Sequence, residues 1–183
     1  TLGSGTDSYT YTYSGTGTHG AQNVTATAGT NTITTLDAAD IITLGTGVDT
    51  VNTGAGNDTI NTATANLVST DTIDGGTGTD TLTFSDATAT ATVVDADFTN
   101  IDNVETVTLN AGNDTITLGA ASSAAGVTTL NILAGTNSVT VGSGHTANLT
   151  IAATSGTDTI DASAYTGALT VQVQAAELNG DTI

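Results

Sequence analysis

Residues 44–52 read LGTGVDTVN, and residues 53–61 follow without a gap as TGAGNDTIN. Both nonamers have Gly at the second and fourth positions, Asp at the sixth and a large aliphatic residue at the eighth. Residues 75–83 read GGTGTDTLT, which repeats the pattern and adds a Gly at the first position. Repetition at a fixed short period indicates a solenoid, in which each unit stacks on the next.

The nonamer frame extends beyond these copies. Residues 26–61 hold four uninterrupted copies, and a four-residue insertion at 62–65 separates them from the copies at 66–74 and 75–83. Looser copies lie at 2–10 and 109–117. Strong acidity with few aromatic residues is also typical of disorder. A disordered chain has no reason to keep this register, so we expect an ordered coil.

Each position of the nonamer suits a coiled sheet that binds a hard cation. Gly allows a tight turn with positive φ and close approach of neighbouring turns. Asp supplies a hard oxygen ligand for Ca²⁺, and turn carbonyls can complete the coordination. The aliphatic residue would point inward and its Thr or Asn neighbours outward. Asp and Gly also favour simple turns, but the sustained register favours the metal interpretation.

If two nonamers make one coil, the acidic positions form two edges. One edge would carry Asn31, Asp49 and Asp71, and the other Asp40, Asp58 and Asp80, with calcium between successive loops. The candidate metal residues also include Asp114 and Asp158, in the second half of the chain. The candidate turn glycines are Gly45, Gly47, Gly54, Gly56, Gly76 and Gly78.

The nonamer resembles the glycine-rich repeat of RTX proteins, which bind calcium in a parallel β-roll. Two further phrases, FTNIDNVETVTL at 98–109 and IDASAYTGALTV at 160–171, resemble phrases of bacterial surface-layer and large RTX proteins. The resemblance implies a calcium-dependent lattice protein exported by type I secretion.

We predict an all-β fold, a right-handed parallel β-solenoid. Residues 1–98 would form the calcium-binding β-roll, and residues 99–183 a broader parallel β-helix that continues it. Runs 129–133, 148–152 and 169–173 recur at the spacing expected for one face of such a helix. Residues 90–97 and 120–126 would be connections, and we expect little helix. The chain, which lacks Met, is interpreted as a piece of a larger protein.

The formal net charge is −18, with no Lys or Arg. Nucleic-acid binding requires cations that neutralise phosphates, so this partner is excluded. An anionic membrane would repel the chain unless a divalent cation bridged them. No apolar run reaches transmembrane length, so we expect no direct membrane insertion.

No catalytic constellation is evident, and we predict that the chain is not an enzyme. His19 and His145 lie in polar turns, where a solvent-facing loop position is expected. Asp95 with Asp97, and Asp102 with Glu105, are close carboxylate pairs of the kind that glycosidases use. Sugar sites usually add aromatic platforms, however, and the chain has only four Tyr and two Phe.

Two surface patterns have ordinary explanations. Tyr9, Tyr11 and Tyr13 alternate as in an exposed aromatic ladder, or as in a plain strand near a solenoid end. Outward Thr residues would form ranks like those of ice-binding solenoids. These ranks are interrupted at Asn52, Asn61, Asp74 and Asp161, and Thr is in any case a good strand former.

The expected function is structural: a surface-layer segment on the cell exterior that folds and assembles with calcium. Its expected partners are calcium ions, further copies of itself in a lattice or filament, and a cell-surface polysaccharide contacted through another region. Two alternatives remain. One is a calcium-stiffened stalk of an RTX adhesin or biofilm matrix protein, and the other is the folding-assist domain of a secreted RTX enzyme.

Overall fold

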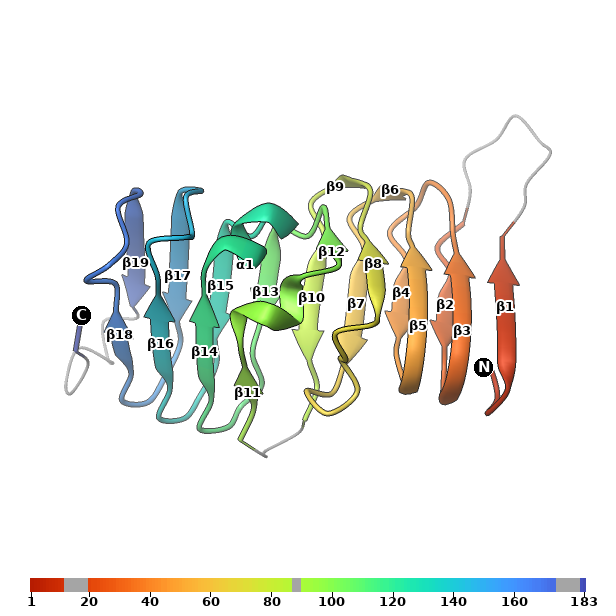
Figure 1. Ribbon diagram of the computed structural model, residues 1–183, viewed down its shortest axis with the longest axis horizontal. Helices are drawn as coiled ribbons and strands as arrows, with labels where there is room; N and C mark the ends of the chain where they lie inside the picture. The colour runs from red at the N-terminus through yellow and green to blue at the C-terminus, as the bar shows by residue number, and fades with distance from the viewer. Residues whose placement is uncertain (12–19, 87–89, 174–181) are drawn as a thin grey trace.

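The computed structural model describes residues 1–11, 20–86, 90–173 and 182–183. These residues coil into an all-parallel β-solenoid (Figure 1). The chain runs along the front, crosses over one edge to the back and returns while advancing from right to left, so the coil is right-handed. This is the usual hand of parallel crossovers, and the predicted fold class is confirmed.

Three long sheets form the walls of the solenoid. A five-stranded front sheet contains β1 (Thr6–Thr10), β3 (Ala28–Thr34), β5 (Thr46–Asn52), β8 (Thr72–Asp74) and β12 (Ile101–Asp102). A four-stranded front sheet contains β11 (Thr92–Val93), β14 (Thr115–Leu118), β16 (Ser138–Val141) and β18 (Thr159–Asp161). A small sheet pairs β6 (Ala55–Gly56) with β9 (Thr77–Gly78).

The back wall is one eight-stranded sheet that spans both halves of the chain. Its strands are β2 (Asn23–Thr25), β4 (Ile41–Thr43), β7 (Thr59–Thr62), β10 (Thr81–Phe84), β13 (Thr106–Thr108), β15 (Thr129–Ile132), β17 (Leu149–Ala153) and β19 (Leu169–Val173). The predicted recurrence of runs 129–133, 148–152 and 169–173 on one face is confirmed, because β15, β17 and β19 are neighbours.

The core consists of aliphatic side chains stacked in register. On the front wall, Ile33, Val51, Ile73 and Ile101 pair along the five-stranded sheet. Ile42, Ile60 and Leu82 stack in the same way on the back wall, and each is fully buried. Burial of such a side chain contributes about 1.5–3 kcal/mol, so the eighth position of the nonamer supplies the main driving force for stacking.

The coil becomes wider after β10. Strands β14, β15 and β16 each bury two aliphatic side chains at alternate positions. Strand β3 buries only one, Ile33, beside the polar Asn31. Two helical segments accompany the change, a 3₁₀ turn η1 (Asp95–Phe98) and the six-residue helix α1 (Ala120–Ala125). The expected connections at 90–97 and 120–126 thus hold short elements, and the first also contains β11. The domain boundary at residue 98 remains a prediction.

Two sequence expectations concern single residues. Tyr9 lies in β1, as the strand interpretation predicts, whereas Tyr13 and His19 lie outside the described residues. His145 is fully buried, so the expected solvent-facing position is wrong. Within the described part of the chain, no helix is long and apolar enough to cross a membrane.

Candidate calcium-binding edges

The turns at both edges are built around glycines that lie directly under the backbone of the preceding coil. A Cβ on Gly47, which has φ of 127°, would lie 1.9 Å from the carbonyl oxygen of Gly29. A Cβ on Gly78, at φ of 146°, would lie 1.5 Å from the carbonyl oxygen of Gly56. Only Gly fits such positions. A Cβ built on any of the other four predicted turn glycines would also lie within 2.3 Å of a carbonyl oxygen of the neighbouring coil; these are Gly45, Gly54, Gly56 and Gly76.

The first edge row consists of Asn31, Asp49 and Asp71, in the order that the sequence predicts. Asn31 and Asp49 are register partners on β3 and β5, and the Asn31 amide nitrogen donates to Asp49 Oδ1 at 2.7 Å. The backbone N–H of Asp49 donates to Asp71 Oδ1 at 2.8 Å. Asp71 Oδ2 accepts from the backbone N–H of Val68 at 2.8 Å, so both of its oxygens have protein donors.

The second edge row runs along the opposite edge and contains Asp40, Asp58 and Asp80. The backbone N–H of Asp40 donates to Asp58 Oδ1, and that of Asp58 to Asp80 Oδ1, each at 2.7 Å. The row continues to Glu105, whose Oε2 accepts from the backbone N–H of Asp80 at 2.8 Å. The sequence did not identify Glu105 as a ligand, although it lies nine residues before Asp114 at the sixth position of 100–108, because this nonamer has no Gly and has Glu in place of Asp.

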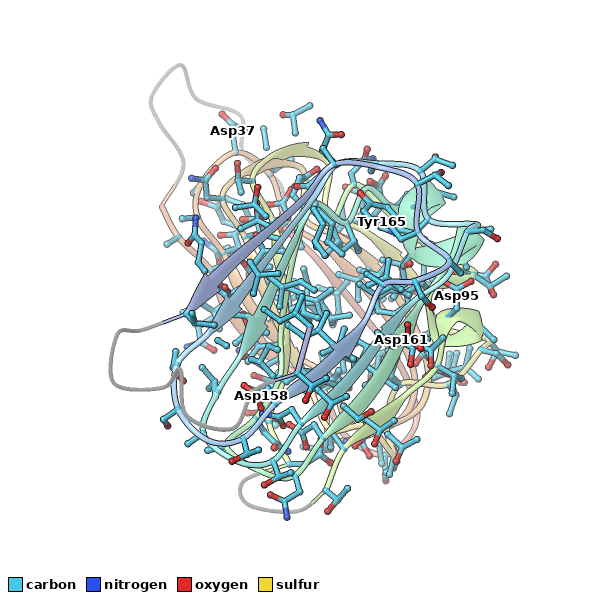
Figure 2. The ribbon with its side chains drawn as sticks, turned by 90° about the vertical axis from the view of Figure 1, so that its left-hand side faces the viewer. Asp37, Asp95, Asp158, Asp161 and Tyr165 are labelled. Atoms are coloured by element: carbon cyan, nitrogen blue, oxygen red, sulfur yellow. The ribbon has the colours of Figure 1, made fainter. Side chains whose placement is uncertain are left out.

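A third row lies at the same edge as the first, where β14, β16 and β18 begin (Figure 1). It contains Asp114, Asn137 and Asp158, and Figure 2 places Asp158 at the edge opposite Asp37. The backbone N–H of Asp114 donates to Asn137 Oδ1 at 2.9 Å, and the Asn137 side-chain amide donates to Asp158 Oδ1 at 2.9 Å. Asn137 was also missed, because a search for acids passes over an amide.

One oxygen of most row carboxylates has no protein partner. Oδ2 is buried and without a hydrogen-bond donor in Asp40, Asp49, Asp58, Asp80 and Asp114. A buried anionic oxygen is costly unless a donor or cation meets it, and the chain contains no Lys or Arg. The unused oxygens therefore fit a hard divalent cation, which prefers carboxylate and carbonyl ligands.

The rows also carry unfavourable electrostatics in the absence of metal. Burial raises the pKa of Asp80 to about 6, with smaller contributions from the negative charges of Asp58, Glu105 and Asp74. Burial likewise raises the pKa of Asp58, Asp71 and Asp114. A bound cation removes this penalty, so metal binding and folding are coupled.

The two carboxylate pairs considered for catalysis have other surroundings. Burial alone would raise the pKa of Asp95, but hydrogen bonds from Ser122, Ala121 and Gly119 outweigh it and lower the pKa. Asp95 Oδ1 accepts from the backbone N–H of Gly119 at 2.7 Å and of Ser122 at 2.9 Å, so its carboxylate caps the start of α1. Glu105 belongs to the second edge row. Among the described residues, no group of three or more His, Asp or Glu side chains is arranged to hold a metal ion, so carbonyl oxygens of the turns would have to complete a calcium site at the edge rows.

His145 lies in a buried cluster at the wider end. Its Nδ1 is 3.2 Å from Ser122 Oγ, and its ring centroid is 5.9 Å from that of Tyr165, which Figure 2 labels. The Tyr165 hydroxyl donates to the carbonyl oxygen of Ala147 at 2.5 Å. Burial lowers the pKa of His145, so the ring is held neutral as a core residue.

Comparison with known proteins identifies the repeats. A family profile, described as RTX calcium-binding nonapeptide repeat (4 copies), matches residues 25–60, 69–84 and 102–122. No curated protein and no solved structure matches the chain significantly. The matched segments contain every residue of the first and second edge rows, together with Asp114 of the third row. These stretches of the solenoid edges are therefore RTX nonapeptide repeats, and such repeats bind Ca²⁺.

Proposed function

We propose that the chain is a calcium-stiffened structural segment of a bacterial surface layer, exported by type I secretion and assembled outside the cell. RTX repeat proteins are typically secreted, and this supports the extracellular location. The observation that carries the proposal is the alignment of buried carboxylates, each with one unpartnered oxygen, along both edges of a chain that has no Lys or Arg.

The proposed ligands are the carboxylates of Asp40, Asp49, Asp58, Asp71 and Asp80, together with carbonyl oxygens of the glycine turns. Asp114 and Asp158 are proposed to extend the set along the third row, and Glu105 to close the second. Stacked carboxylates repel one another at the low dielectric of a packed turn. Calcium would offset that repulsion and hold successive coils together, which gives a rigid rod.

Extracellular calcium modules bind at about 10⁻⁴ to 10⁻³ M, well above cytosolic calcium. The chain would therefore stay unfolded before export and fold afterwards. Circular dichroism during a calcium titration, followed by EGTA, tests this. We expect strand signal to rise with calcium in this range and to fall with EGTA. Strand content that ignores both additions would overturn the calcium-dependent role.

The rod shape in Figure 1 equally supports a stalk of an adhesin or biofilm matrix protein. The two roles differ in self-association. Electron microscopy of the calcium-loaded protein separates them, because a surface-layer segment gives two-dimensional order and a stalk gives separate rods. Arrays that form only with calcium would support the first role.

A further inference from the structure

The outward face of the eight-stranded sheet carries an unbroken rank of threonines. At one outward position of the sheet, the register pairs threonine with threonine through six successive strands, from β7 to β19. The rank consists of Thr59, Thr81, Thr106, Thr129, Thr150 and Thr170. It crosses from the nonapeptide repeats into the wider coils, so the repeat sequence alone does not account for it.

A second outward row lies two residues further along each strand. It consists of Thr25, Thr43, Asn61, Thr83, Thr108, Asn131, Ala152 and Gln172. The side-chain amide of Asn131 donates to Thr108 Oγ1 at 3.1 Å and links neighbouring coils on this face. We call the two rows from β7 to β19 the threonine face.

The interruptions foreseen from the sequence fall almost entirely on other walls. Asn52 and Asp74 lie on the five-stranded sheet and Asp161 on the four-stranded sheet. Asn61 alone belongs to the eight-stranded sheet, and it lies in the second row. Only the strand register shows that the threonine rank itself is continuous.

The threonine face is also free of charge in a very acidic chain. The chain has 18 Asp and Glu, and none occupies either row of this face. The five-stranded sheet, by contrast, places Asp74 and Asp102 side by side in its outward row. A neutral face on a strongly anionic molecule suits an uncharged partner, because a charged surface would retain its own water and counterions.

The face has the regularity of a lattice. Neighbouring strands lie about 4.7–4.9 Å apart, and residues two apart along a strand are separated by about 6.6 Å. Each threonine of the first row adds one hydroxyl and one methyl group to this rectangular grid, whereas from β7 to β19 the second row has threonine only at Thr83 and Thr108. A protein partner does not require the same side chain in six successive strands, whereas a periodic ligand does. Along the direction of the first row, water molecules on a prism face of ice repeat at a distance close to the spacing between strands.

We propose that the threonine face binds ice. The methyl groups would hold the first water layer in place, and the hydroxyl groups would hydrogen-bond to it at the lattice spacing. This inference needs the folded solenoid but does not depend on a surface-layer role.

Ice recrystallisation inhibition by the purified chain in excess calcium tests the proposal. The face variant is Thr106→Tyr/Thr129→Tyr, in the middle of the rank, and the matched control is Thr32→Tyr/Thr50→Tyr on the five-stranded sheet. We expect the parent and the control to inhibit crystal growth at equal concentration, and the face variant to need at least ten times more protein.

Circular dichroism checks that each variant regains the parent's strand signal in calcium. Should the Tyr variant not fold, Thr106→Ser/Thr129→Ser removes only the methyl groups, and we expect it to weaken inhibition several-fold. Absence of inhibition by the folded parent overturns the proposal, as does equal loss in the face and control variants. A third result would assign the face to self-association instead. In that case the parent does not inhibit ice growth and sediments as a dimer, and the face variant, but not the control, sediments as a monomer.

Discussion

In the second edge row, Asp58 and Asp80 each use their two oxygens in different ways. Oδ1 of Asp58 and of Asp80 accepts a backbone N–H from the preceding coil, while Oδ2 has no protein donor. The backbone bond positions the side chain, and the free oxygen is left for a cation. Replacement by Asn should therefore keep the stacking geometry and remove the anionic ligand.

Asp80→Asn should weaken calcium binding about ten-fold, because it removes one charged ligand from the proposed site. Isothermal titration calorimetry with calcium measures this change. The control is Asp161→Asn, which alters the net charge equally at an exposed position on β18. Equal weakening in both variants would mean that net charge, and not the second edge row, determines affinity.

Gly78→Ala should be severely destabilising, by more than about 2 kcal/mol, since it combines a steric clash with backbone strain. The added Cβ would lie 1.5 Å from the Gly56 carbonyl oxygen. Thermal denaturation in calcium reports the loss. Gly5→Ala serves as the control, because a Cβ there has no atom within 4 Å. A midpoint for the Gly78 variant equal to that of the control would contradict the stacked-turn geometry.

The strands show which residues the sequence could predict. A nine-residue period places Asp40, Asp49 and Asp58 at alternating edges, and the structure has them there. Glu105 and Asn137 were not found in this way. The nonamer 100–108 has Glu105 at the acidic position but no Gly, and Asn137 is an amide. His145 was misplaced because its neighbours are polar, whereas the turn directs its ring inward onto Ser122.

Amides replace acids at one position in each of two rows. The side-chain amides of Asn31 and Asn137 donate to Asp49 and Asp158, at 2.7 and 2.9 Å. Such a donor offsets the charge of the next carboxylate without metal. The third row, with one amide between two acids, should therefore depend less on calcium than the second, which contains only acids from Asp40 to Glu105.

Asn137→Asp should make the wider half more calcium-dependent. The change removes a donor to Asp158 and adds a negative charge, which together cost about 1–3 kcal/mol in the absence of metal. The loss should appear as a higher calcium concentration at the midpoint of folding, measured by circular dichroism, while the melting temperature in saturating calcium stays close to that of the parent. A lower melting temperature in saturating calcium, with an unchanged calcium midpoint, would show that the third row does not bind metal.

For the whole molecule, the rows make the calcium-free protein sensitive to pH. Folding raises the pKa of Asp58, Asp71, Asp80 and Asp114, for Asp80 to about 6 from 3.8. These groups therefore stabilise the fold at low pH, and that stability is lost as the pH rises through their folded pKa values. His145 acts oppositely, because its lowered pKa favours the fold at higher pH.

In EGTA, the strand signal in circular dichroism should rise as the pH falls from 7.5 to 5, because the carboxylates of the rows outnumber His145. Asp80→Asn should reduce this rise, which separates the row from the general relief of net charge. In saturating calcium the melting temperature should instead fall on acidification, since protons compete with the metal. A calcium-free strand signal that falls on acidification would contradict the assigned burial of the rows.

The parallel stacking has a mechanical consequence. Hydrogen bonds between strands of a solenoid lie along its long axis, so a pull on the two ends loads the contact between one coil and the next. Each coil touches only its neighbours, and coils can detach singly from an end. A detached coil of about 22 residues releases roughly 75 Å of extended chain. Under tension along its axis, the rod would therefore lengthen in steps, one coil at a time, and dissipate mechanical energy before it unfolds completely.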